Sequence, residues 1–132
     1  MPPPQRILIA DDQRPARKGL HALLSLCPQV EVIGEAVDGR DAVLLAAEQR
    51  PDVVLMDLRM PVMDGLEATR RIKSALPEVR VVMLTLHAER EAEALTAGAD
   101  AFVVKGGSSE ALWAAIGGAG SPGFPPESEA GC

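Results

Sequence analysis

Five short apolar runs, separated by stretches of helical periodicity, are the feature that most limits how this chain can fold. The runs are rich in Val, Ile and Leu, and the last three are nearly continuous rather than alternating. Continuous apolar runs are typical of parallel strands that are covered on both faces. The predicted strands are Ile7 to Ala10, Val30 to Ala36, Val53 to Met56, Val79 to Leu84 and Ala101 to Val104.

Helical spacing fills the intervals between these runs. Apolar faces at helical spacing are marked by Leu20, Leu23, Leu24 and Cys27, then by Leu66, Thr69, Ile72 and Leu76, and last by Leu112, Trp113 and Ile116. Asp38-Gly39 and Asp64 stand where helices begin, with Glu67 completing a capping-box pattern. The segment that ends at Gly98 has only Leu95 as a large apolar residue and is the weakest helix. Alternation of strand and helix over roughly 110 residues predicts an α/β fold with a single doubly wound parallel sheet.

Composition narrows the class of protein further. A chain of 132 residues with 47% hydrophobic and 24% charged residues is expected to form one globular domain. Thirteen Lys and Arg against nineteen Asp and Glu give a net charge of −6, which argues against sequence-independent nucleic-acid binding. Two cysteines are too few for a disulfide framework, and no apolar run approaches the ~20 residues that span a bilayer. We therefore expect a reduced, cytoplasmic, soluble domain with no membrane partner.

Polar residues follow four of the predicted strands. Asp11 and Asp12 follow the first strand, Asp57 the third and Lys105 the fifth, while Thr85 closes the fourth. Parallel strands bring their carboxyl ends to one edge of the sheet, where doubly wound folds bind ligands. Three carboxylates gathered there would repel one another and raise at least one pKa unless a cation neutralised them. A set of oxygen ligands with high negative charge favours Mg²⁺.

These residue types together predict phosphoryl-transfer chemistry. The Lys105 ammonium suits a phosphoryl oxygen, the Thr85 hydroxyl is a donor, and Asp57 is a candidate nucleophile that would form an aspartyl phosphate. Each residue alone has a simpler interpretation: Asp11 and Asp12 as caps of the first helix, Asp57 as a turn residue, Lys105 as a solvated surface charge and Thr85 as a strand former. Their meeting at one edge favours the functional interpretation.

At this point the sequence resembles the receiver domain of two-component response regulators. The resemblance covers about residues 5 to 117 and rests on the stretches Ile7 to Asp12, Pro51 to Gly65, Val81 to Thr85 and Gly98 to Lys105. Within it, Val32 to Ala36, Asp38-Gly39 and His87 resemble the subclass that carries a LuxR/NarL-type DNA-binding domain.

The resemblance implies a flavodoxin-like fold with five helices and strand order 2-1-3-4-5. It also implies a role for each site residue: Asp57 accepts a phosphoryl group from a sensor histidine kinase; Asp11, Asp12, Asp57 and the backbone carbonyl of Arg59 hold Mg²⁺; Lys105 contacts the phosphoryl group; Thr85 and Phe102 form the switch. Phosphorylation would then change the surface formed by the helix before Gly98, the strand Ala101 to Val104 and the last helix. That surface is a possible homodimer contact, and DNA would be reached only through a C-terminal domain absent from this chain.

Three features depart from the family pattern. The interval from Thr85 to Lys105 is about two residues shorter than expected, Gly106 stands where many receivers have a proline, and no helix-turn-helix domain follows. We therefore divide the chain into a flexible N-terminus at 1–4, a receiver domain at 5–118 and a Gly/Pro-rich tail or truncated linker at 119–132.

Two other functions remain as alternatives to the switch, which would at most assist its own phosphorylation and dephosphorylation. One is a stand-alone or pseudo-receiver interaction module that never takes phosphate. The other is an aspartyl-phosphate hydrolase of the haloacid dehalogenase type. That class needs a second aspartate two residues after a nucleophile on its first strand, whereas Asp57-Leu58-Arg59 follows the third strand.

Overall fold

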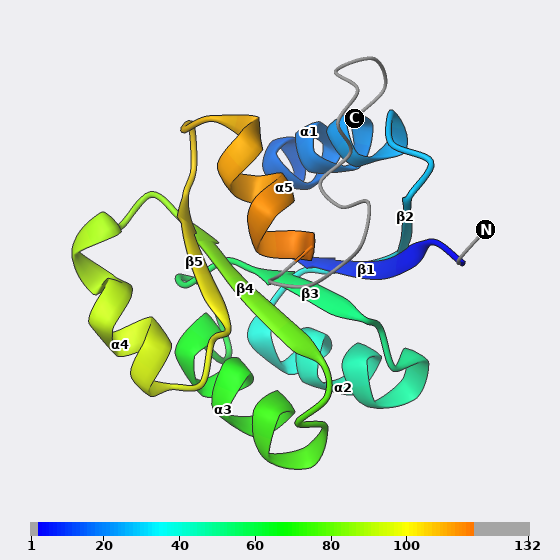
Figure 1. Cartoon of the computed structure of the whole chain (residues 1–132). Coiled ribbons are helices and arrows are strands. Elements are labelled where there is room, and N and C mark those ends of the chain that lie inside the picture. Colours follow the sequence, from blue (N-terminus) through cyan, green and yellow to red (C-terminus); the bar gives the residue numbers. More distant parts are fainter. Residues whose placement is uncertain (1–2, 118–132) are drawn as a thin grey trace.

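The computed structural model describes residues 3–117 as a parallel sheet between two layers of helices (Figure 1). The five strands lie in the order β2-β1-β3-β4-β5. Each pairs with its neighbours in parallel, and the β1–β2 pairing shifts register between Ile7 and Leu8. The strands are β1 Gln5–Ala10, β2 Val30–Ala36, β3 Val53–Met56, β4 Arg80–Thr85 and β5 Ala101–Val104. The expected fold class and strand order are confirmed.

Helices α1 and α5 cover one face of the sheet, and α2, α3 and α4 cover the other (Figure 1). A short 3₁₀ turn at Ala88–Arg90 leads into α4. The helices are α1 Arg14–Ser25, α2 Gly39–Gln49, α3 Gly65–Ala75, α4 Glu91–Thr96 and α5 Ser109–Gly117. Within residues 3–117, no helix combines the length and apolar character needed to cross a membrane.

Two apolar cores explain why the strand sequences are nearly continuous in hydrophobicity. All four residues of β3 are buried, because alternate side chains enter the core under α1 and α5 and the core under α2, α3 and α4. Leu112, Trp113 and Ile116 of α5 are buried in the first of these cores, as their spacing predicts. Phe102 of β5 is half-buried against the second.

Aspartates begin two of the helices, as predicted. The Asp38 carboxylate accepts from the Asp41 N–H at 2.7 Å and the Asp64 carboxylate accepts from the Glu67 N–H at 2.9 Å, so each satisfies a first-turn donor. The reciprocal half of the capping box is missing at α3, because the Glu67 carboxylate pairs with two arginines of its own helix. Asp64 therefore caps α3 by one hydrogen bond rather than two.

Element boundaries differ from the sequence expectation in a few places. β1 begins at Gln5 because that residue still pairs with Val30, and β4 extends to Thr85 because Thr85 pairs with Val104; backbone pairing thus outlasts the apolar runs. α1 ends at Ser25, so Cys27 is buried beyond the helix rather than on its face. The weak segment before Gly98 is indeed short, with six residues in α4.

Candidate functional site

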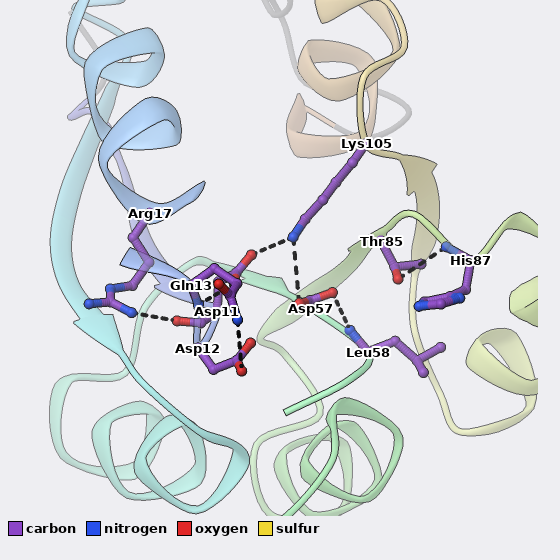
Figure 2. A network of polar contacts seen from close by, with 9 residues as sticks. All are labelled: Asp11, Asp12, Gln13, Arg17, Asp57, Leu58, Thr85, His87 and Lys105. Atoms are coloured by element: carbon purple, nitrogen blue, oxygen red, sulfur yellow. Dashed lines mark hydrogen bonds and ion pairs between the residues drawn. The ribbon is translucent and has the colours of Figure 1, made fainter. Parts of the chain in front are cut away.

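The three aspartates singled out in the sequence lie together at the carboxyl edge of the sheet. Asp11 and Asp12 follow β1 and Asp57 follows β3, and these two strands are neighbours. One carboxylate oxygen of each lies within 4.8 Å of the others (Figure 2). Asp57 thus joins Asp11 and Asp12, which are distant from it in the chain, in one acidic cluster, because parallel strands place their ends at the same edge. We call these three residues the aspartate cluster.

Asp11 is held by hydrogen bonds through its N–H and both of its carboxylate oxygens. Its side chain is almost completely buried, and its N–H donates to the Ala36 carbonyl at 3.1 Å. One carboxylate oxygen accepts from the Gln13 N–H at 2.8 Å, and the other accepts from the Lys105 ammonium at 2.5 Å. The simpler interpretation of Asp11 and Asp12 as helix caps is wrong, because Gln13, the residue just before α1, occupies the N-cap position.

Asp57 has an environment that suits a reactive carboxylate. The residue is 9% exposed; its N–H donates to the Ala10 carbonyl at 2.9 Å, and its Oδ1 accepts from the Leu58 N–H at 2.9 Å. Burial raises the pKa of Asp57, the Lys105 charge opposes that rise, and the neighbouring Asp11 carboxylate adds to it. The carboxylate is therefore less well stabilised than an exposed one and gains from any added positive charge.

Lys105 enters the aspartate cluster from the end of β5. Its backbone N–H donates to the Thr85 carbonyl at 2.8 Å, which fixes where the side chain leaves the sheet. The ammonium lies between two carboxylates, closest to Asp11 and 3.5 Å from Asp57 Oδ2 (Figure 2). Lys105 is thus no solvated surface lysine. The next residue, Gly106, has a φ of +83°, which proline cannot adopt, so glycine at this position follows from the local backbone.

Thr85, Arg59 and Phe102 are the remaining predicted site residues. Thr85 is fully buried at the end of β4, on the Asp57 side of the site, and its hydroxyl oxygen accepts from the His87 N–H at 3.3 Å (Figure 2). Arg59 lies in the exposed part of the loop after β3, two residues beyond Asp57. Phe102 is half-buried in β5 opposite Met83, and β4 separates its strand from β3, which Asp57 follows.

The loop between β3 and α3 carries backbone features that sequence reasoning missed. Val62 has a φ of +70°, and the Met63 N–H donates to the Pro61 carbonyl at 2.7 Å, closing a tight three-residue turn. Gly65 packs so closely that a Cβ there would lie 2.0 Å from the Asp57 carbonyl oxygen. The end of the loop at Gly65 is therefore held against its beginning, where the Gly65 N–H also donates to the Leu58 carbonyl at 2.7 Å. The Gly65 position had a detectable signal in Asp64-Gly65, whereas nothing in the sequence marks Val62.

Sequence reasoning also missed Arg17 and Glu35. The Arg17 guanidinium donates to the Asp11 carbonyl at 2.8 Å and to a Glu35 carboxylate oxygen at 3.0 Å (Figure 2 shows the first contact). An arginine on a helix and a glutamate on an edge strand are common surface residues, so their types alone do not predict this contact.

The aspartate cluster fits a hard divalent cation. Its donors are carboxylate oxygens, the ligand type that Mg²⁺ prefers, and they come from rigid strand ends. One ammonium among three carboxylates leaves an excess of negative charge, so a further cation is electrostatically favoured. The residues present could therefore hold a metal. Burial, with a smaller contribution from Asp11, raises the pKa of Asp57, and an added cation would oppose that rise.

Comparison with known proteins agrees with this geometry. The family model described as "Response regulator receiver domain" matches residues 7–117. The transcriptional regulatory protein LnrK of Bacillus subtilis is 43% identical over 113 residues, which are 84% of this chain and 51% of that protein. The chain thus spans about half the length of the curated relatives it matches.

Solved structures give the same result. The receiver domain of the putative response regulator NarL from Mycobacterium tuberculosis has a TM-score of 0.79 at 35% identity, covering 84% of this chain and 91% of that one. A chain of the CheX-CheY-BeF3-Mg+2 complex from Borrelia burgdorferi has a TM-score of 0.78 at 28% identity, covering 86% of this chain and 87% of that one. The chain belongs to the response regulator receiver domains, the signalling domains of two-component systems, and is related to transcriptional regulators.

Proposed function

We propose that this domain is a phosphorylation-controlled switch in which Asp57 accepts a phosphoryl group from a sensor histidine kinase. The observation that carries the proposal is the aspartate cluster itself, with one oxygen of each carboxylate within 4.8 Å and the Lys105 ammonium on two of them. This set provides a nucleophile, a cation site and a fixed positive charge, which are the parts that phosphoryl transfer needs.

Asp57 is the nucleophile in this proposal. One of its carboxylate oxygens forms a bond to phosphorus while the phosphorus–nitrogen bond of the kinase phosphohistidine breaks; the electron pair of that bond stays on the imidazole nitrogen, which takes up a proton. Desolvation of Asp57 by burial keeps its negative charge poorly compensated and available for attack. The amide of Leu58, already donating to Oδ1, holds the carboxylate in one orientation.

Asp11, Asp12, Asp57 and the backbone carbonyl of Arg59 would hold Mg²⁺. When bound, Mg²⁺ supplies charge neutralisation for the phosphoryl oxygens and the carboxylates around them. A solved relative has been crystallised with BeF3 and Mg, which supports this choice of cation by analogy. The Lys105 ammonium, between Asp11 and Asp57, would contact the transferred phosphoryl group.

Thr85 and Phe102 would relay the new charge. The buried Thr85 hydroxyl would turn towards a phosphoryl oxygen, and the half-buried Phe102 would follow into the vacated space. This would alter the surface formed by α4, β5 and α5, a possible homodimer contact. We assign the receiver domain to residues 5–118; the 119–132 tail assigned from the sequence lies outside the described residues. By analogy with LnrK, a transcriptional regulatory protein, the proposed output is transcriptional regulation. The resemblance to the LuxR/NarL-type subclass adds the proposals that the protein is cytoplasmic and reaches DNA through a DNA-binding domain beyond this chain. We also propose that the domain catalyses no reaction other than its own phosphorylation and dephosphorylation.

The test is phosphorylation of the purified chain by phosphoramidate in the presence of Mg²⁺. Intact-mass spectrometry should show the mass of one added phosphoryl group, and Asp57→Asn should abolish it. Asp52→Asn is the matched control, because Asp52 is an exposed aspartate at the opposite end of β3 from Asp57. The control should be phosphorylated like the wild type.

Other outcomes would identify the alternative functions. A wild-type chain that binds Mg²⁺ but takes no phosphate would be an interaction module. Continuous hydrolysis of many phosphoesters would identify a hydrolase. Phosphate that persists in Asp57→Asn would show that the nucleophile is another residue.

A further inference from the structure

Arg17 links the aspartate cluster to the edge strand of the sheet. It lies in the second turn of α1, with a side chain that is 12% exposed. Its Nη1 donates to the Asp11 carbonyl at 2.8 Å, and its Nε donates to Glu35 Oε1 on β2 at 3.0 Å. His21, one turn further along the helix, contacts the other oxygen of Glu35 at 3.1 Å. The guanidinium is thus held in place on two sides.

The Asp11 carbonyl is an informative contact point, because it belongs to the peptide unit that joins Asp11 to Asp12. The preceding peptide unit is also fixed, since the Asp11 N–H donates to the Ala36 carbonyl at 3.1 Å. With Arg17 on the carbonyl, both peptide units around Asp11 have set orientations. The residue before α1 adds two contacts, because the Gln13 N–H donates to Asp11 Oδ1 at 2.8 Å and its side-chain amide donates to Asp12 Oδ2 at 3.3 Å. Arg17 thus fixes the carbonyl of the peptide that precedes Asp12, while Gln13 contacts the Asp12 carboxylate itself.

Charge balance explains why an arginine is tolerated so close to a cation site. An uncompensated guanidinium would repel a divalent cation. Glu35 compensates it: the hydrogen bond from His21, followed by that from Arg17, lowers the pKa of Glu35, so that this carboxylate is ionised at neutral pH. The Arg17–Glu35 pair thus supplies rigid, directed donors without adding net charge. Lysine could not do both, since it lacks the planar fork that reaches two acceptors.

We propose that Arg17, held by Glu35, is a positioning residue of the cation site: it orients the Asp11–Asp12 peptide so that both carboxylates face the bound divalent ion. This inference rests on the proposed function, because it takes the aspartate cluster to be a Mg²⁺ site. Partners that orient metal ligands typically change metal affinity by about 10- to 100-fold when they are removed.

The test is the Mg²⁺ dissociation constant of the full chain, measured by isothermal titration calorimetry for the wild type, Arg17→Met and Arg17→Lys. Both variants should bind Mg²⁺ about tenfold more weakly than the wild type. The sign is decisive, because removing a positive charge from an acidic site should by electrostatics alone strengthen binding. Arg14→Met is the matched control: Arg14 is exposed at the start of the same helix, and its loss should leave the affinity unchanged or slightly higher.

A double variant separates positioning from stability. Arg17→Met combined with Glu35→Gln removes both charges, so it should recover most of the thermal stability lost by Arg17→Met alone. Its Mg²⁺ affinity should remain low. Mg²⁺ binding by Arg17→Met that equals or exceeds the wild type, or recovery of affinity together with stability in the double variant, would overturn the proposal. A wild type that binds no Mg²⁺ would instead refute the proposed function, and with it the premise of this inference.

Discussion

The replacement Lys105→Met tests the electrostatics of the aspartate cluster most directly. The ammonium lies 2.5 Å from Asp11 Oδ2 and 3.5 Å from Asp57 Oδ2, and it is the cation that contacts these two carboxylates within residues 3–117. Methionine keeps much of the apolar stem and removes the charge. In the absence of Mg²⁺, we expect a less stable fold, because the buried carboxylates lose their compensating charge.

Two limits set the magnitude of this effect. At an effective dielectric of about 20, a charge pair at 3.5 Å gains about 5 kcal/mol before the cost of desolvation. Since the Lys105 side chain is 21% exposed, solvent screening reduces that figure. The loss of stability in Lys105→Met has an upper limit, because one aspartate of the cluster can bind a proton and lose its charge. Protonating an ordinary aspartate at neutral pH costs about 4 kcal/mol, so the loss cannot exceed that figure. We therefore expect a loss of about 2–4 kcal/mol, or roughly 8–16 °C in Tm for a domain of this size.

The assay is thermal unfolding of the wild type and Lys105→Met, each with a chelator and with millimolar Mg²⁺. Mg²⁺ should restore most of the lost stability, because the ion replaces the missing positive charge. The stabilisation by Mg²⁺ should thus be larger in the variant than in the wild type. The reasoning is refuted if the variant is as stable as the wild type in chelator, or if Mg²⁺ stabilises both proteins equally.

Four further changes test other parts of the structure. Val62→Gly should raise the free energy of unfolding by about 1 kcal/mol in urea titrations, because glycine adopts a φ of +70° without strain; a loss of stability would contradict the strained turn. Gly65→Ala should lower it by more than about 3 kcal/mol or prevent folding, since the new Cβ would lie 2.0 Å from the Asp57 carbonyl oxygen. Lys73→Met should cost about 1–3 kcal/mol in the same titrations, because its ammonium donates to the Asp100 carboxylate at 2.9 Å and to two backbone carbonyls of the loop after α3. Because the pKa of Asp57 is raised in the folded state, the folded protein binds this proton more tightly than the unfolded chain does. The ionised Asp57 therefore destabilises the metal-free fold at a pH above its folded pKa. This destabilisation disappears below pH 3.8, the pKa of Asp57 in the unfolded chain. In chelator, Asp57→Asn should therefore be more stable than the wild type at neutral pH, and melting curves should show the difference shrinking as the pH falls towards 4.

The strands and their order could be predicted because each strand is buried on both faces. β3 illustrates this, since its four residues are apolar and all four are buried. The boundaries were less predictable, because pairing can continue beyond the apolar run: Gln5 and Thr85 are strand residues through their backbone partners Val30 and Val104. The weak apolar pattern before Gly98 predicted a weak helix, and α4 is indeed short. Its large apolar residue, Leu95, is nearly half exposed.

The composition of the aspartate cluster could also be predicted, and for the same topological reason. Asp11, Asp57 and Lys105 each follow a strand, and parallel strands place such residues at one edge whatever their separation in the chain. What topology cannot predict is which atoms meet. The interpretation of Lys105 as a phosphoryl contact did not anticipate that its ammonium lies closest to Asp11 in the metal-free structure.

Sequence reasoning missed the residues that hold the site in shape, because these residues act through the backbone and not through reactive side chains. Arg17 reaches the cluster through a backbone carbonyl, and Val62 shapes the loop after Asp57 through its own φ angle. An arginine on a helix is a common surface residue, and the residue type of Val62 does not indicate its φ angle, so neither leaves a motif. The reactive groups are recognisable because their chemistry restricts them to a few residue types. The groups that orient them must therefore be found from hydrogen bonds and backbone angles, and their importance measured by affinity rather than by loss of the fold.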